Sequence, residues 1–261
     1  MSILQSKFRL MIALLAGVFA LATPSLAIPV SGSLSIGGSS AEVGATFLNF
    51  VCNNALTASC PAGYGNFVVS APVSGSFVPY NGDTGFIRNL SQATAPINQT
   101  FSLPNFVIFD PAGTVVPPDI ALDLTFIFTG VGGQAQCGLA PAPGQTCTPA
   151  GIPGLITASN PLGLSPFTLA NTQVGSSATF SVAGTARRIS TGEVSTFTGV
   201  FTAQFNEFFQ EYLGTIASGG TITNSYSATF EATLIPIPEA TSITLLVGGL
   251  LLIGGLIRRR M

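Results

Sequence analysis

IALDLTFIFT, residues 120–129, alternates large apolar side chains with smaller or polar ones. Successive side chains of a β-strand point to opposite faces of a sheet, so this pattern predicts a strand with one buried face. The predicted core face carries Ile120, Leu122, Leu124, Phe126 and Phe128. The opposite face carries Ala121, Asp123, Thr125, Ile127 and Thr129.

The same alternation recurs in two later stretches, residues 194–205 and 224–234. Their predicted core residues are Phe197, Phe201 and Phe205, and Tyr226, Ala228, Phe230 and Leu234. Weaker strand patterns cover residues 44–51, 67–73, 101–109 and 178–189. Pro104 lacks a backbone donor, so its segment is predicted to be an edge strand or to contain a bulge.

One short helix is predicted over residues 206–213, with Asn206 as N-cap, Glu207 in the first turn and Gly214 as the stop. Many short strands without βαβ alternation predict an all-β domain, an antiparallel β-sandwich or a jelly-roll-like fold. The Pro/Gly-rich stretch 131–153 is predicted to be a loop, with a domain boundary as the alternative.

The N-terminus has the pattern of a secretory signal peptide. Lys7 and Arg9 precede an apolar run, residues 10–21, and Ser25 and Ala27 are the small residues that a signal peptidase reads. Cleavage is predicted after Ala27, with Ala22 as the alternative site. A transmembrane anchor is disfavoured because the run is shorter than the ~20 residues that span a bilayer and because Pro24 follows it.

The C-terminus predicts a short membrane helix. An uncharged stretch, residues 241–257, would rise about 26 Å as a helix, close to the hydrocarbon thickness of a bilayer. Arg258, Arg259 and Arg260 follow it and would stay on the cytoplasmic side as a stop-transfer signal. The rest of the chain would then lie outside the cytoplasm.

Pro238 and Glu239, followed by an apolar stretch and an arginine cluster, resemble the PEP-CTERM sorting signal of Gram-negative bacteria. In that family an exosortase, a membrane transpeptidase-like enzyme, removes the tag, and the product reaches the cell surface or an exopolysaccharide matrix. The resemblance covers about the last 25 residues, and Ala240 stands where the usual motif has a second proline. It implies Pro238, Glu239 and Ala240 as the sorting motif. An ordinary stop-transfer anchor is the alternative.

Three parts follow from these patterns: a signal peptide (1–27), an extracellular β domain (28–235) and a sorting tag (236–261). With residues 1–27 and Arg258, Arg259 and Arg260 set aside, the only basic residues are Arg88, Arg187 and Arg188, against ten acidic residues, a net charge of −7. A domain this acidic offers no basic surface that could bind a phosphate backbone, so nucleic acid is not an expected partner.

Four cysteines in an exported chain predict disulfides. Short separations favour Cys52 with Cys60 and Cys137 with Cys147, although three connectivities are possible. A zinc site is disfavoured because the chain has no CxxC spacing and no histidine.

The absence of histidine excludes Ser-His-Asp and Cys-His catalysis, and the absence of lysine after Lys7 excludes Schiff bases and Walker A loops. No catalytic residue, metal site or cofactor is predicted. Asp83-Thr84-Gly85 matches the aspartic protease triplet, but Asn81-Gly82 before it predicts a turn. The remaining carboxylates considered for glycoside hydrolysis are Asp119, Asp123, Glu193 and Glu231, and Asn81, Asp83, Asp119 and Asp123 are considered for calcium.

The sequence therefore predicts an exported, non-catalytic protein, held transiently at the inner membrane and then sorted to the cell surface or an exopolysaccharide matrix. Its expected partners are signal peptidase, an exosortase-type enzyme, the inner membrane and exopolysaccharide. A carbohydrate- or calcium-binding module is the alternative, and a carboxylate-dependent secreted hydrolase is a more remote one.

Overall fold

The computed structural model describes residues 29–112, 118–152 and 154–235. Its elements in chain order are β1 (Gly32–Val43), β2 (Phe47–Phe50), β3 (Tyr64–Ser70), the 3-10 helix η1 (Gly75–Tyr80), β4 (Thr84–Arg88), β5 (Leu90–Ser91), β6 (Thr100–Phe109), β7 (Ile120–Ile127), the 3-10 helix η2 (Gln134–Gly138), β8 (Thr146–Cys147), β9 (Thr168–Asn171), β10 (Ser176–Arg188), β11 (Val194–Phe205), α2 (Phe209–Ala217) and β12 (Ile222–Thr233).

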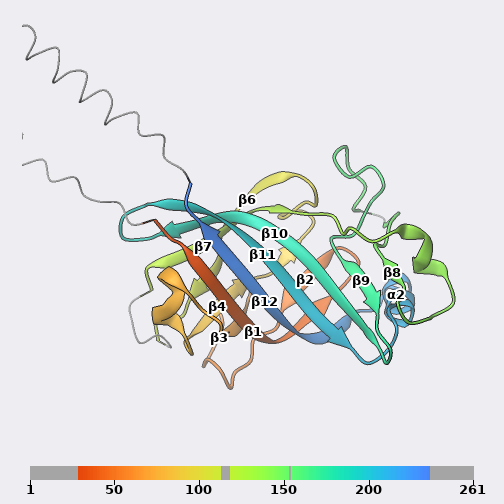
Figure 1. Ribbon diagram of the computed structural model, residues 1–261, viewed down its shortest axis with the longest axis horizontal. Coiled ribbons are helices and arrows are strands. Elements are labelled where there is room, and N and C mark those ends of the chain that lie inside the picture. Colours follow the sequence, from red (N-terminus) through yellow and green to blue (C-terminus); the bar gives the residue numbers. More distant parts are fainter. Residues whose placement is uncertain (1–28, 113–117, 153, 236–261) are drawn as a thin grey trace, which may run out of the picture.

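Eight strands close into an up-and-down antiparallel barrel (Figure 1). Going round the barrel, β1, β3, β4, β6, β7, β10, β11 and β12 follow one another in chain order, and β12 pairs with β1. The prediction of a β-sandwich or jelly roll is therefore wrong. Strand alternation is the same in an open sheet and in a barrel, and only the pairing between the two ends of the domain distinguishes them.

The elements outside the barrel gather at one end, which we call the mouth end. There β1 finishes at Val43 and β12 begins at Ile222, which pair with each other. β2 and β5, β8 and β9, and α2 all belong to connections at this end, and Figure 1 shows α2, β8 and β9 together there. At the opposite base end Gly32 pairs with Ala232, so the described chain begins and finishes at the base.

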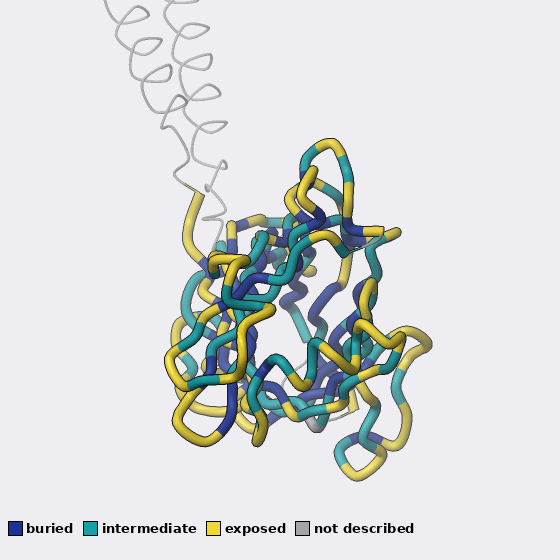
Figure 2. Tube along the Cα trace, turned by 90° about the vertical axis from the view of Figure 1, so that its right-hand side faces the viewer, coloured by how far each residue is buried: buried dark blue, intermediate teal, exposed yellow. Residues whose placement is uncertain are grey.

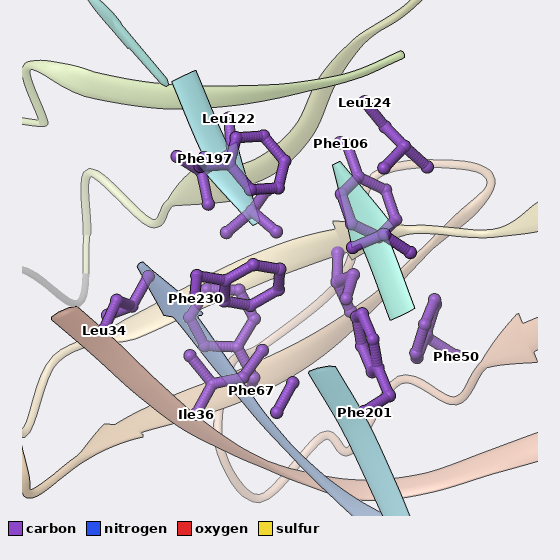
Figure 3. Close-up of a cluster of buried hydrophobic side chains, with 14 of the residues drawn as sticks. Leu34, Ile36, Phe50, Phe67, Phe106, Leu122, Leu124, Phe197, Phe201 and Phe230 are labelled. Carbon is purple, nitrogen blue, oxygen red and sulfur yellow. The ribbon is translucent and has the colours of Figure 1, made fainter. Parts of the chain in front are cut away.

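The base half of the barrel is filled with aromatic and aliphatic side chains. Phe230 is fully buried, with its ring centroid 5.8 Å from that of Phe197 and 5.5 Å from that of Phe201. Figure 3 shows this cluster with Leu34 and Phe67 beside it. Seen from the mouth end, the strands form a ring (Figure 2). The interior of the base half is a packed core of the kind small barrels require.

Strand β7, which lies in the alternating stretch 120–129, contains a bulge. Leu124 pairs with Gly184, but Ala183 pairs with Phe126, so Thr125 has no partner of its own in β10. One extra residue moves every later side chain to the other face of the sheet. Ile120, Leu122 and Leu124 are buried as predicted, whereas Phe126 is only partly buried, Phe128 is 41% exposed and Ile127 is buried in its place. The predicted core role of Phe126 and Phe128 is therefore wrong.

The other strand predictions fare better. Strands occupy all the predicted stretches, and β6 shows register shifts on both sides of Leu103, which confirms an irregularity next to Pro104. Of the predicted core residues in β11 and β12, Phe205 is only partly buried, and Leu234 lies past the strand and is exposed.

The predictions for the two ends of the chain, residues 1–27 and 236–261, lie outside the described residues. Among the residues that the structure describes, no helix is long and apolar enough to cross a membrane.

Phe230→Ala should lower the free energy of unfolding by about 3–5 kcal/mol, because it empties a fully buried aromatic site. Phe128→Ala makes the same change at an exposed position and should cost roughly 1 kcal/mol or less. Denaturant titration of both variants measures the difference. Equal losses would contradict the bulge.

Candidate mouth pocket

A pocket of about 170 Å³ lies at the mouth end of the barrel. Side chains of β1, β10, β11 and β12 line it from the barrel, and β2, β5, α2 and residues of the stretches 149–152 and 155–169 line it from outside. Its aliphatic and aromatic lining includes Val43, Leu48, Phe50, Leu90, Ile97, Ile127, Leu155, Leu169, Phe180, Phe201, Phe209, Leu213, Ile216 and Ile222.

Aromatic rings separate the pocket from the filled core. Phe180 and Phe201 stack with ring centroids 4.5 Å apart, and the ring of Phe50 lies 5.8 Å from Phe201 and 5.0 Å from Tyr226. All four side chains line the pocket. Rings packed at these distances stabilise the floor of the pocket by more than their buried area alone.

Small side chains create the space above that floor. On β10 the inward positions change from Phe180 and Val182 in the core to Ala178 and Ser176 at the mouth. On β1 they change from Leu34 and Ile36 to Ala41. Because eight strands fix the barrel width, shorter inward side chains leave an opening that the strands cannot close by moving inward.

The pocket has an uncharged wall. Among the described residues that line it, none is Asp, Glu, Lys or Arg. The polar lining residues are Thr46, Ser91, Gln92, Ser165, Ser176, Thr202, Tyr212, Asn224 and Tyr226. An apolar cavity with few polar groups suits a ligand that needs desolvation and shape rather than ionic contacts.

Tyr226 carries a buried hydroxyl with no hydrogen-bond partner among the described residues. Burial raises the pKa of this phenol above its usual value, so it stays neutral. Its ring covers Gly38, the residue paired with it across the strands, where any side chain would collide with the ring. The glycine thus lets Tyr226 fold against β1 at the edge of the pocket.

Helix α2 covers the mouth, and a side chain distant in sequence caps it. The backbone NH of Phe209 donates to Asn171 Oδ1 at 2.9 Å. Asn171 Nδ2 donates to Gln210 Oε1 at 2.9 Å, and Gln210 Nε2 donates to Gln145 Oε1 at 2.7 Å. This amide cluster joins the start of α2 to β9 and to the loop before β8.

The predicted helix ends are therefore wrong. Asn206 does not cap the helix, which begins three residues later at Phe209, and Gly214 does not stop it, since α2 runs on to Ala217. Asn171 caps the helix because β9 places its side chain next to the first turn of α2. At the other end, Gly214 lies within the helix instead of ending it.

Both predicted disulfides are present, Cys52 with Cys60 and Cys137 with Cys147. The first lies in the β1–β3 connection and the second in the β7–β10 connection, so both cross-link mouth loops. Such bonds stabilise the folded state mainly by restricting the conformations of the unfolded chain. They indicate a protein of an oxidising, extracytoplasmic compartment.

Two of the carboxylates considered for chemistry, Asp123 and Asp119, form ion pairs and hydrogen bonds within the structure. Arg187 Nε lies 3.1 Å from Asp123 Oδ2, and Asn105 NH donates to Asp123 Oδ1 at 2.7 Å. Arg188 Nη1 lies 2.9 Å from Asp119 Oδ2. Desolvation raises the pKa of Asp119, but hydrogen bonds from Ser190 and Arg188 outweigh it and lower the pKa overall.

Asn81, Gly82 and Asp83 form the turn between η1 and β4, in which the NH of Asp83 donates to the Tyr80 carbonyl at 2.9 Å. Glu193 lies in the β10–β11 turn, and Glu231 is exposed on β12. Among the described residues no group of three or more Cys, Asp or Glu side chains is placed to hold a metal ion. Ser25, Ala27, Pro238, Glu239, Ala240 and Arg258–Arg260 lie outside the described residues.

Asn171→Ala should lower the free energy of unfolding by about 1–3 kcal/mol, because it leaves buried amide groups and the Phe209 NH without partners. It should also speed hydrogen exchange in α2. Asn206→Ala removes the same side chain from the position that sequence favours, and a change within about 0.5 kcal/mol is expected. If Asn206→Ala were the more damaging variant, the capping assignment would be wrong.

No family model matches the chain, and comparison with curated proteins and with solved structures finds no match. The functional proposal therefore rests mainly on the pocket and the residues around it.

Proposed function

We propose that this protein is an exported, non-catalytic binding protein whose barrel holds a small apolar molecule in the mouth pocket. One observation carries the proposal: an uncharged, mostly aliphatic and aromatic pocket of about 170 Å³. For scale, an apolar cavity of about 150 Å³ in another protein binds benzene. Eight-stranded barrels are wide enough to hold one small ligand where side chains leave room.

The pocket supports an apolar ligand over a sugar. A sugar presents hydroxyls all round and needs convergent polar side chains, whereas the floor here is built from Phe50, Phe180, Phe201 and Tyr226. The pocket does not suit calcium either, because no carboxylate is among the described lining residues.

Delivery is part of the same proposal. The disulfides fit an oxidising compartment, and the signal peptide pattern at residues 1–27 fits export. The resemblance of residues 236–261 to a sorting tag supports transient attachment to the inner membrane, processing by an exosortase-type enzyme, and a final location at the cell surface or in an exopolysaccharide matrix.

N-Phenyl-1-naphthylamine, an uncharged dye that fluoresces in apolar surroundings, tests the pocket. The exported protein in non-reducing buffer should bind it with a micromolar dissociation constant, and Ala178→Phe should weaken binding tenfold or more by filling the space above Phe180. Ser181→Phe places the same ring on the outer face of β10 and serves as the control. Unchanged binding in Ala178→Phe would place the dye elsewhere and refute the proposal.

The sorting tag has a separate test. Replacing Pro238 and Glu239 by alanine in the native host should leave the protein in the membrane fraction with its full C-terminus, while the wild-type chain loses the tag. Intact-mass measurement of both fractions reports the cleavage. Wild-type protein that keeps its whole C-terminus in membranes would refute sorting through this tag.

A further inference from the structure

None of the described arginines lines the pocket. Arg187 and Arg188 end β10 at the base of the barrel, where each is paired with an aspartate, Asp123 or Asp119. Arg88 ends β4 at the mouth end, but it donates to the carbonyl oxygen of Pro104 and is not a lining residue. No cation among the described residues is therefore placed to neutralise an acidic group in the pocket.

Helix α2, which covers the mouth, and the turn before it carry the opposite charge. Glu207 lies two residues before α2 and Glu211 lies in its first turn, and both side chains are exposed. Burying a carboxylate, a sulfonate or an ammonium in an uncharged wall costs several kcal/mol unless an opposite charge or several hydrogen-bond partners compensate. For an anion the carboxylates next to α2 add repulsion to that cost, whereas for a cation they offset part of it.

We propose that the pocket takes apolar molecules whose polar end is neutral or cationic and rejects those whose polar end is an anion. This inference rests on the proposed function and narrows it. It sets ionised fatty acids outside the ligand class and places long-chain alcohols, amines and uncharged hydrocarbons inside it. The acidic mouth is the specificity-determining feature, and no side chain of the pocket needs to form an ion pair with the ligand.

Three ten-carbon compounds test the inference by displacing N-phenyl-1-naphthylamine at pH 8 and low ionic strength: decanol, decylammonium and decanoate. The three compounds have ten carbons each and differ in the charge of the polar group. Decanol and decylammonium should displace the dye at concentrations at least tenfold below that of decanoate. Added salt should narrow the gap between the two ions, since it screens the mouth carboxylates.

Gln92 gives the matched variants. It lines the pocket just after β5 and is partly buried. Gln92→Arg adds a cation on a longer side chain and should improve displacement by decanoate, relative to decanol, about fivefold or more. Gln92→Met alters the lining but keeps it neutral, so the ratio between decanoate and decanol should stay at the wild-type value.

The outcomes separate the two proposals. If the dye binds in the pocket but decanoate displaces it as well as decanol, or decylammonium is as poor as decanoate, the charge inference is overturned and the binding function stands. If Gln92→Arg and Gln92→Met respond alike to decanoate, charge is not the cause of the preference. If the dye does not bind, or binds equally to Ala178→Phe, the proposed function itself fails.

Discussion

The pairing of β12 with β1 is the constraint on which the rest of the structure depends. It joins Gly32 to Ala232 at the base and Val43 to Ile222 at the mouth, so the first and last strands of the domain become neighbours. Closure satisfies the backbone groups that an open sheet would leave at its edges. It also fixes the number of strands at eight and with it the width of the interior. Whether that interior is a core or a pocket then depends only on the size of the inward side chains.

Those side chains divide the barrel into two halves with different tasks. Large rings such as Phe197 and Phe230 fill the base half, and alanine or serine at inward positions such as 176 and 178 leaves the mouth half open. The open half gains less from burial, and its connections are long. Both disulfides and the amide cluster around Asn171 lie in that half. Covalent and polar contacts therefore supply order where apolar packing is thinnest, which is what a ligand pocket in a small domain requires.

Local patterns predicted the strands well because alternation depends on nearest neighbours in sequence. The failures have a common cause in contacts between distant residues. The bulge at Thr125 is set by pairing with Ala183 and Gly184, and the cap of α2 comes from Asn171, 38 residues before Phe209. A sandwich and a barrel share the same alternation, so only the β1–β12 pairing could decide between them. The pocket could not be predicted from the sequence. Ala178 lines it, but a buried alanine in a strand is also an ordinary core residue, and its sequence neighbours do not indicate a cavity.

The direction of the chain adds a last constraint on how the pocket is used. Residue 235 lies past the base end of β12, and β12 extends from the mouth to the base over 12 residues, roughly 40 Å at ~3.3 Å per residue. A chain held at a membrane through its C-terminus would therefore present the mouth away from that membrane. A ligand would then reach the pocket from the side that faces away from that membrane. The acidic mouth meets the ligand first in that geometry, so charge selection would act before the apolar chain reaches the aromatic floor.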